Sequence, residues 1–150
     1  MRLILLASLL LTISTAWSQF EGEYGVGVMI GNPTGLNGKY WLPDNKAIDG
    51  GAAMSLGKNT DFSLHSDYLF HNDGALFFND EHPLDLFYGI GGRIEFGDDI
   101  ELGVRVPVGI THKFTAEKAD IFAEIAPIID LVGRQGLEVH FGVGARYYFK

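Results

Sequence analysis

A two-residue alternation of side-chain character constrains the fold of this chain more than any other feature. In residues 137–149, apolar and aromatic side chains occupy every odd position, whereas Glu138, His140 and Arg146 occupy even ones. Successive side chains of a β-strand point to opposite faces, so each such segment is a strand with one apolar face. Within these segments, every Asp, Glu, Lys and Arg lies on the other face. The pattern predicts eight strands, at residues 23–31, 34–42, 47–56, 61–71, 84–96, 100–113, 120–131 and 137–149.

The charged side of the strands also carries most of the strand glycines, among them Gly25, Gly27 and Gly109. Glycine weakens a solvated strand, whereas inside a narrow barrel it makes room for a long neighbouring side chain. A water-soluble barrel would bury the apolar side chains instead, and alternation alone leaves that alternative open. The glycines favour an all-β fold, an eight-stranded antiparallel up-and-down transmembrane β-barrel with a polar, filled interior.

The turn at residues 97–99 sets the register of one predicted strand pair. A three-residue loop at this position would place Arg93 opposite Gly103 and Arg105 opposite Gly91. Each large side chain would then face a glycine, as a crowded interior requires.

The N-terminus has the features of a secretory signal peptide. Arg2 precedes an apolar run at residues 3–13 that is too short to cross a bilayer as a helix, and small residues follow at Ala16 and Ser18. We therefore expect a signal peptide at residues 1–18 and one barrel domain at residues 19–150. Removal of Arg2 leaves 10 basic and 19 acidic residues, a net charge of −9. This acidity argues against nucleic acid as a partner, and the absence of cysteine excludes disulfides.

Aromatic residues on the apolar face gather at strand ends that would share one rim of the barrel. With an N-terminus in the periplasm, the predicted girdle at this rim consists of Tyr24, Tyr40, Tyr68, Phe70, Tyr147 and Phe149. Phe62, Phe96 and Phe141 would lie at the opposite interface. Such girdles mark both membrane interfaces of outer-membrane barrels, although aromatic residues are also common in ordinary strands.

The chain resembles a known class of membrane barrels over essentially its whole mature length. The resemblance is to the eight-stranded OmpA/OmpX-type barrels, and more closely to a group of largely uncharacterised bacterial outer-membrane β-barrel proteins. The segments that carry it are Pro33-Thr34-Gly35-Leu36, Gly38-Lys39-Tyr40-Trp41-Leu42, Asp67-Tyr68-Leu69-Phe70-His71, Tyr88-Gly89-Ile90-Gly91-Gly92-Arg93, Gly103-Val104-Arg105-Val106-Pro107-Val108-Gly109, Asp120-Ile121-Phe122-Ala123-Glu124-Ile125-Ala126-Pro127 and Arg146-Tyr147-Tyr148-Phe149. Gly144, Tyr147 and Phe149 resemble the signal read by the barrel-assembly machinery, except that Lys150 follows the aromatic residue. The resemblance implies a bacterial outer-membrane location but no particular activity.

Charged residues on the inner face form the candidate site. The predicted lumen charge network consists of Lys39, Asp67, Arg93, Glu95, Arg105, Glu124, Glu138 and Arg146. Eight strands enclose only enough space for side chains, so these charges must pair with one another or with trapped water. Arg93, Arg105 and Glu124 are expected to meet near mid-barrel. A gated ion path through such pairs is the alternative interpretation.

Two groups of residues could in principle carry chemistry. Ser63, His65 and Asp67 face the same way on one strand, but residues two apart are about 7 Å apart, too far for a nucleophile and its base. A metal site at His65, His71 and Asp67 lacks a convincing third or fourth ligand type. We therefore expect no catalytic, cofactor-binding or metal-binding residues, and no enzyme, with a lipid hydrolase as a remote alternative.

The predicted loops bear on the function that remains. The outer loops at residues 32–33, 57–60, 97–99 and 132–136 are short, and the longest connection, residues 72–83, would lie in the periplasm. Recognition usually resides in loops, which weakens an adhesin-like role. We predict a monomeric structural or envelope-integrity protein whose partners are outer-membrane lipid and the assembly machinery. A small gated pore or a surface-binding barrel is the alternative.

Overall fold

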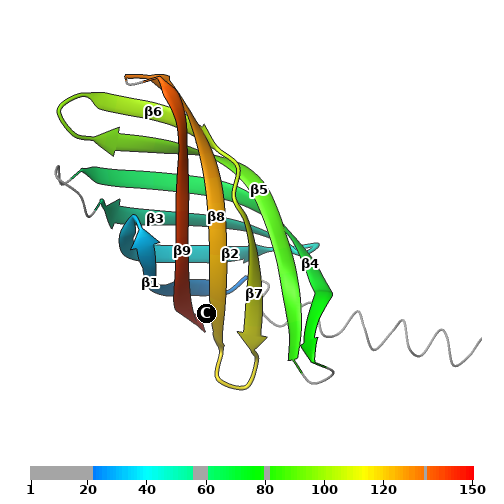
Figure 1. Cartoon of the computed structure of the whole chain (residues 1–150). Helices are drawn as coiled ribbons and strands as arrows, with labels where there is room; N and C mark the ends of the chain where they lie inside the picture. The colour runs from blue at the N-terminus through cyan, green and yellow to red at the C-terminus, as the bar shows by residue number, and fades with distance from the viewer. Residues whose placement is uncertain (1–21, 56–60, 80–81, 134) are drawn as a thin grey trace, which may run out of the picture.

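The computed structural model describes residues 22–55, 61–79, 82–133 and 135–150, and the predicted signal peptide lies outside these residues. Nine antiparallel strands form one sheet, coloured along the chain in Figure 1. They are β1 (Tyr24–Asn32), β2 (Thr34–Leu42), β3 (Lys46–Met54), β4 (Phe62–Asn79), β5 (His82–Phe96), β6 (Ile100–Arg105), β7 (Val108–Phe114), β8 (Ala119–Val132) and β9 (Gly136–Phe149). Among the described residues, no helix is long and apolar enough to cross a membrane.

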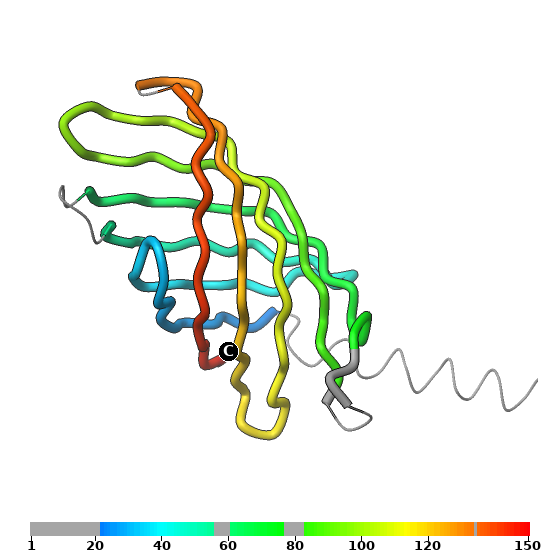
Figure 2. Tube along the Cα trace, viewed as in Figure 1, coloured from blue at the N-terminus to red at the C-terminus, as the bar shows by residue number. Residues whose placement is uncertain are grey.

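The sheet closes into a ring because its first and last strands pair. β1 runs antiparallel to β9 from Tyr24 opposite Phe149 to Asn32 opposite Phe141. The other strands also pair with their neighbours along the chain, except that β6 and β7 do not pair with each other and both lie between β5 and β8. The connections therefore run up and down around the ring. The Cα trace in Figure 2 shows the successive strands side by side around the ring. We call the end with Tyr24 and Phe149 the base, and the end with the β1–β2 and β5–β6 turns the mouth.

Side chains alternate between buried and exposed along each strand. In β8, Phe122, Ala126 and Ile128 are buried, whereas Ile121 and Ile125 are exposed. The apolar face of the strands is thus the exposed face, and the charged residues lie on the buried one. The predicted β5–β6 register is confirmed, with Arg93 opposite Gly103 and Arg105 opposite Gly91.

The expected strand at residues 100–113 is divided, so the structure has nine strands where the sequence predicted eight. The interruption falls at Val106-Pro107, between β6 and β7. Proline has no N–H to donate to a ladder, which explains the break. The Val106 N–H still donates to the Pro127 carbonyl at 2.9 Å, and the Gly89 N–H donates to the Pro107 carbonyl at 3.0 Å. The chain therefore stays between β5 and β8 throughout.

The prediction of a long loop at residues 72–83 is wrong, because most of this segment belongs to two strands. β4 continues to Asn79 and β5 starts at His82, so this segment extends a hairpin at the base. The β4–β5 pairing shifts register between Asn72 and Leu76, and again between Phe77 and Asn79. These bulges interrupt the simple alternation on which the prediction depended, and a bulge also bends the strand that carries it.

Candidate functional site

Arg105, at the end of β6, is the centre of the buried charges. Its side chain is completely buried, and its Nε atom lies 2.9 Å from Oδ2 of Asp67 on β4. It also forms an ion pair with Glu124 on β8. A guanidinium this deep needs such partners, because an unpaired buried charge is strongly destabilising.

A second guanidinium, that of Arg146 on β9, is also buried. Its Nε and Nη2 atoms donate to the two carboxylate oxygens of Asp120 at 3.0 and 3.2 Å, a bidentate geometry. Its Nη1 donates to Oδ1 of Asn37 at 2.8 Å and lies 4.0 Å from Oδ2 of Asp49. The Tyr148 hydroxyl donates to Asp120 at 2.6 Å. We call the residues around the two guanidinium groups the central network: Asn37, Asp49, Asp67, Arg105, Asp120, Glu124, Arg146 and Tyr148.

Arg93, on β5, organises a separate group nearer the mouth. Its guanidinium lies 2.7 Å from Asp130, 2.9 Å from Glu138, 3.3 Å from Glu95 and 3.5 Å from Glu101. His140 Nε2 lies 3.1 Å from Nη1 of Arg93, the atom that also contacts Glu138. We call these residues the mouth cluster: Arg93, Glu95, Glu101, Asp130, Glu138 and His140. The sequence predicted that Arg93, Arg105 and Glu124 would meet. This is correct for Arg105 and Glu124, whereas Arg93 pairs with the acidic residues of the mouth cluster.

A cavity of about 470 Å³ opens above the mouth cluster. Among the described residues that line it, none is Lys or Arg and seven are acidic: Asp61, Glu95, Asp98, Asp99, Glu101, Asp130 and Glu138. A concave surface lined by one sign of charge concentrates counter-ions, so this mouth attracts cations.

Lys39, on β2, lies toward the base, where its backbone is opposite Gly25 of β1. Its Nζ atom is 2.7 Å from Nε2 of His71 and 4.3 Å from the ring centre of Trp41. In the same region Lys113 Nζ lies 2.9 Å from Asp73 and 3.0 Å from Asp85. Lys39 is buried, and the side chain of Lys113 is 15% exposed. The ammonium group of each lysine contacts a hydrogen-bond acceptor and an aromatic ring.

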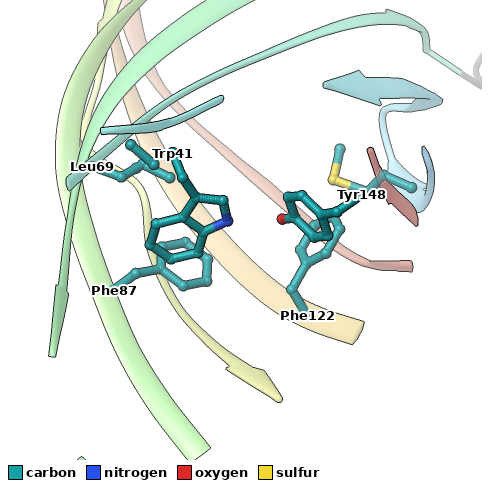
Figure 3. Packing of buried hydrophobic residues seen from close by; sticks show 7 residues of the cluster. Trp41, Leu69, Phe87, Phe122 and Tyr148 are labelled. Carbon is teal, nitrogen blue, oxygen red and sulfur yellow. The ribbon is translucent and has the colours of Figure 1, made fainter. Parts of the chain in front are cut away.

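Aromatic side chains fill the space between these charges. Figure 3 shows Trp41, Phe87 and Leu69 on one side of the enclosed space, and Tyr148 with Phe122 on the other. The Arg146 guanidinium lies 4.0 Å from the ring centre of Phe122, which is a cation–π contact.

The predicted girdle residues lie on the exposed face near the base. Tyr24 contacts Tyr40 at a ring-centre distance of 4.7 Å and Phe149 at 6.3 Å. Phe70 contacts Tyr68 at 5.2 Å. Tyr147 is also exposed, whereas Gly144 of the predicted assembly signal faces inward, against the Phe122 ring. Phe62 and Phe96 contact one another at 6.2 Å near the mouth.

The residues of the two candidate chemical groups do not come together as two single sites among the described residues. Ser63 Oγ is buried and has no hydrogen-bond partner among the described residues, so it does not pair with His65. Asp67, the third member, is committed to Arg105. His71 lies beside Lys39 rather than with His65 and Asp67, and Asp49 of β3 takes its place there.

Two polar residues of the central network and the mouth cluster were not included in the predicted network. Asn37 and His140 lie on the inward-facing positions of their strands, so alternation alone could have identified them. Asp73 could not be found in this way, because it lies in the bulged part of β4 that was taken for a loop.

Comparison with known proteins was consistent with this architecture. The family model of the outer membrane protein β-barrel domain matches residues 3–150. No curated protein matches the chain significantly.

Proposed function

Because the chain belongs to the family of outer membrane protein β-barrel domains, we propose that it spans the outer membrane as a filled, eight-stranded barrel with a structural role in the envelope. Neither catalysis nor open conduction is part of this role. The signal peptide at residues 1–18 would direct export, and the mature protein would act as a monomer.

The count of eight follows if β6 and β7 act as one strand of the wall. β6 pairs with β5 and β8, and β7 pairs with the same two strands. The interruption at Pro107 removes ladder bonds without adding a neighbour. An even number of strands is also the rule for bacterial single-chain barrels.

The observation that carries the proposal is that side-chain bonds cross the ring between strands that are not neighbours. Arg105 of β6 reaches Asp67 of β4, and Arg146 of β9 reaches Asn37 of β2. Arg93 of β5 reaches Glu138 of β9. Such cross-links, together with the aromatic side chains between them, support an interior that is packed rather than open. A packed polar interior resists deformation and leaves no wide path for solutes.

The residues of the buried face also argue against a hydrolase. Ser63 is 1% exposed, so no lipid or peptide could reach its hydroxyl without unfolding of the wall. A nucleophile also needs a base within hydrogen-bond reach, and Ser63 has none among the described residues.

Planar-bilayer recording and a deletion strain test this proposal together. The purified, heat-modifiable protein should give no steady conductance steps. Loss of the gene should make cells more sensitive to detergents and bulky antibiotics, and the wild-type gene should restore resistance. Steady conductance would favour a gated pore, and an unchanged envelope would contradict the structural role. Release of fatty acids from lipid A or phospholipid, lost in Ser63→Ala, would favour the hydrolase.

A further inference from the structure

Three side chains with metal-binding groups meet on the buried face, and two of them belong to the central network. Asp49 comes from β3, whereas His65 and Asp67 come from β4. Each offers one donor atom, and the three donor atoms all lie within 4.8 Å of one another. Asp49 is opposite Asp67 in the β3–β4 register, so the backbone itself brings the two carboxylates together.

Each of the two carboxylates has an oxygen that the protein leaves unsatisfied. Asp49 and Asp67 are only 3% and 2% exposed, and their Oδ1 atoms have no hydrogen-bond partner among the described residues. Their Oδ2 atoms face the guanidinium groups of Arg146 and Arg105, at 4.0 and 2.9 Å. A buried polar atom without a partner is costly, and coordination of a metal is one of the few ways to satisfy a buried carboxylate.

Two glycines provide the space that these ligands occupy. A Cβ atom at Gly51 would lie 2.5 Å from Cε1 of His65, and a Cβ atom at Gly91 would overlap Oδ1 of Asp67. Gly51 is opposite His65 on β3, and Gly91 is opposite Asp67 on β5. Any larger residue at either position would displace a ligand, so the wall on both sides of β4 is shaped around this group.

The balance of charge leaves room for an added cation. Arg105 and Arg146 contact four carboxylates, those of Asp67, Glu124, Asp49 and Asp120. Even with the buried ammonium of Lys39 included, the ionised groups would carry three positive and four negative charges. A buried group with excess negative charge holds a cation or a proton.

We propose that Asp49, His65 and Asp67 bind a divalent transition-metal ion inside the barrel, with zinc as the best fit. Two carboxylate oxygens and one imidazole nitrogen form a mixed donor set that suits zinc, whereas calcium and magnesium prefer oxygen alone. A zinc ion with bonds of about 2.0 to 2.2 Å would draw the three donor atoms closer together. Three protein ligands leave a fourth position for water.

The acidic mouth provides the route by which such an ion would arrive. His65 is opposite Arg93 in the β4–β5 register, so the site adjoins the mouth cluster. The seven acidic residues of the cavity above would concentrate cations there.

Zinc titration of the folded protein in detergent tests the proposal. After EDTA treatment, the wild-type protein should bind one Zn²⁺ by calorimetry and retain it through desalting, as measured by elemental analysis. His65→Gln should weaken binding by about tenfold or more, since even residues that only orient a ligand contribute about ten- to hundredfold. His71→Gln, a change of another buried β4 histidine, should leave the affinity unchanged. Glu101→Gln, a change in the mouth cluster, should weaken binding less than His65→Gln, because it removes one charge of the acidic mouth but no ligand.

Three results would overturn the proposal. If the wild-type protein binds no stoichiometric zinc, the two carboxylates are held together by a shared proton instead. An equal loss of affinity in Glu101→Gln would place the ion among the mouth acids, and an equal loss in His71→Gln would place it toward the base. X-ray absorption of zinc-loaded wild-type protein needs no variant, and a first shell without imidazole would also contradict the site.

Discussion

Several large side chains on the buried face occupy space that a glycine leaves on a neighbouring strand. Tyr148 lies opposite Gly25, and a Cβ atom at Gly25 would lie 2.5 Å from the tyrosine ring. Phe122 occupies the space beside Gly144 in the same way. Glycine on the exposed face is different, because a Cβ at Gly38 would meet only a backbone oxygen, at 3.7 Å.

This difference predicts opposite effects of one substitution at two glycines. Gly25→Ala should destabilise the barrel by about 1–3 kcal/mol, because the completely buried Tyr148 ring has little room to move. Gly38→Ala should be neutral or stabilise the fold by up to about 1 kcal/mol, since it restricts the unfolded chain without a clash. Urea unfolding in lipid vesicles measures both, and equal effects would mean that Tyr148 does not fill the space at Gly25.

The ion pair of Arg105 with Glu124 predicts a coupled loss of stability. Glu124→Ala should cost about 3–5 kcal/mol, because it leaves a buried guanidinium with one partner fewer. The double variant Glu124→Ala with Arg105→Ala should recover part of this loss, since residues in contact are not additive. Glu117→Ala, at an exposed turn position, is the matched control and should change stability by about 0.5 kcal/mol or less. Strict additivity of the two buried changes in urea unfolding would contradict the pairing.

At the scale of the strands, alternation was sufficient to predict most boundaries to within one or two residues. β2 begins at Thr34 and ends at Leu42, as expected. The predicted and observed strands differ at two places, and at both of them the alternation of side chains is interrupted. Pro107 cannot donate a ladder bond, which divides one strand, and the bulge after Asn72 shifts the phase of β4.

The same periodicity predicted whether a side chain points into or out of the ring, but it did not predict which side chains contact one another. Arg93 and Arg105 were correctly placed on the inner face, yet their choice of Asp130 and Asp67 depends on distances across the ring. Such distances follow from the tilt and register of all strands together, which a two-residue period does not contain. For the same reason, the meeting of Asp49 with His65 was not predicted.

The exposed apolar face predicts a cost that depends on depth in the bilayer. Val106, between β6 and β7, is exposed, and Val106→Arg should cost about 2–4 kcal/mol because it places a guanidinium near the hydrocarbon midplane. Val132 is an equally exposed valine at the end of β8, near the mouth. Val132→Arg should therefore cost only about 0–1 kcal/mol. Equal costs in vesicle unfolding, or tolerance of Val106→Arg, would mean that this face does not contact lipid.

At the scale of the whole molecule, closure of the ring depends on β9. β9 pairs with β8 from Gly136 to Tyr147 and also pairs with β1, so the ring remains open until β9 is in place. An open ring would leave two unpaired edges, which are costly in lipid and prone to aggregate. Insertion therefore requires that the C-terminal strand be held until it pairs, and this is the physical reason to expect an assembly signal there.

The exposed aromatic residues at the end of β9 are the candidates for that signal, and they allow recognition to be separated from stability. Tyr147 and Phe149 project from the ring at the base, where Phe149 contacts little besides Tyr24 among the described rings. Phe149→Ala should therefore refold in detergent micelles with near wild-type stability, yet yield much less heat-modifiable barrel in the outer membranes of cells. Phe141→Ala removes an equally exposed phenylalanine from the same face of β9, away from its end, and should assemble normally. If both variants accumulate to the same level in cells, or if Phe149→Ala also fails to refold in micelles, Phe149 acts through the stability of the barrel rather than through recognition by the assembly machinery.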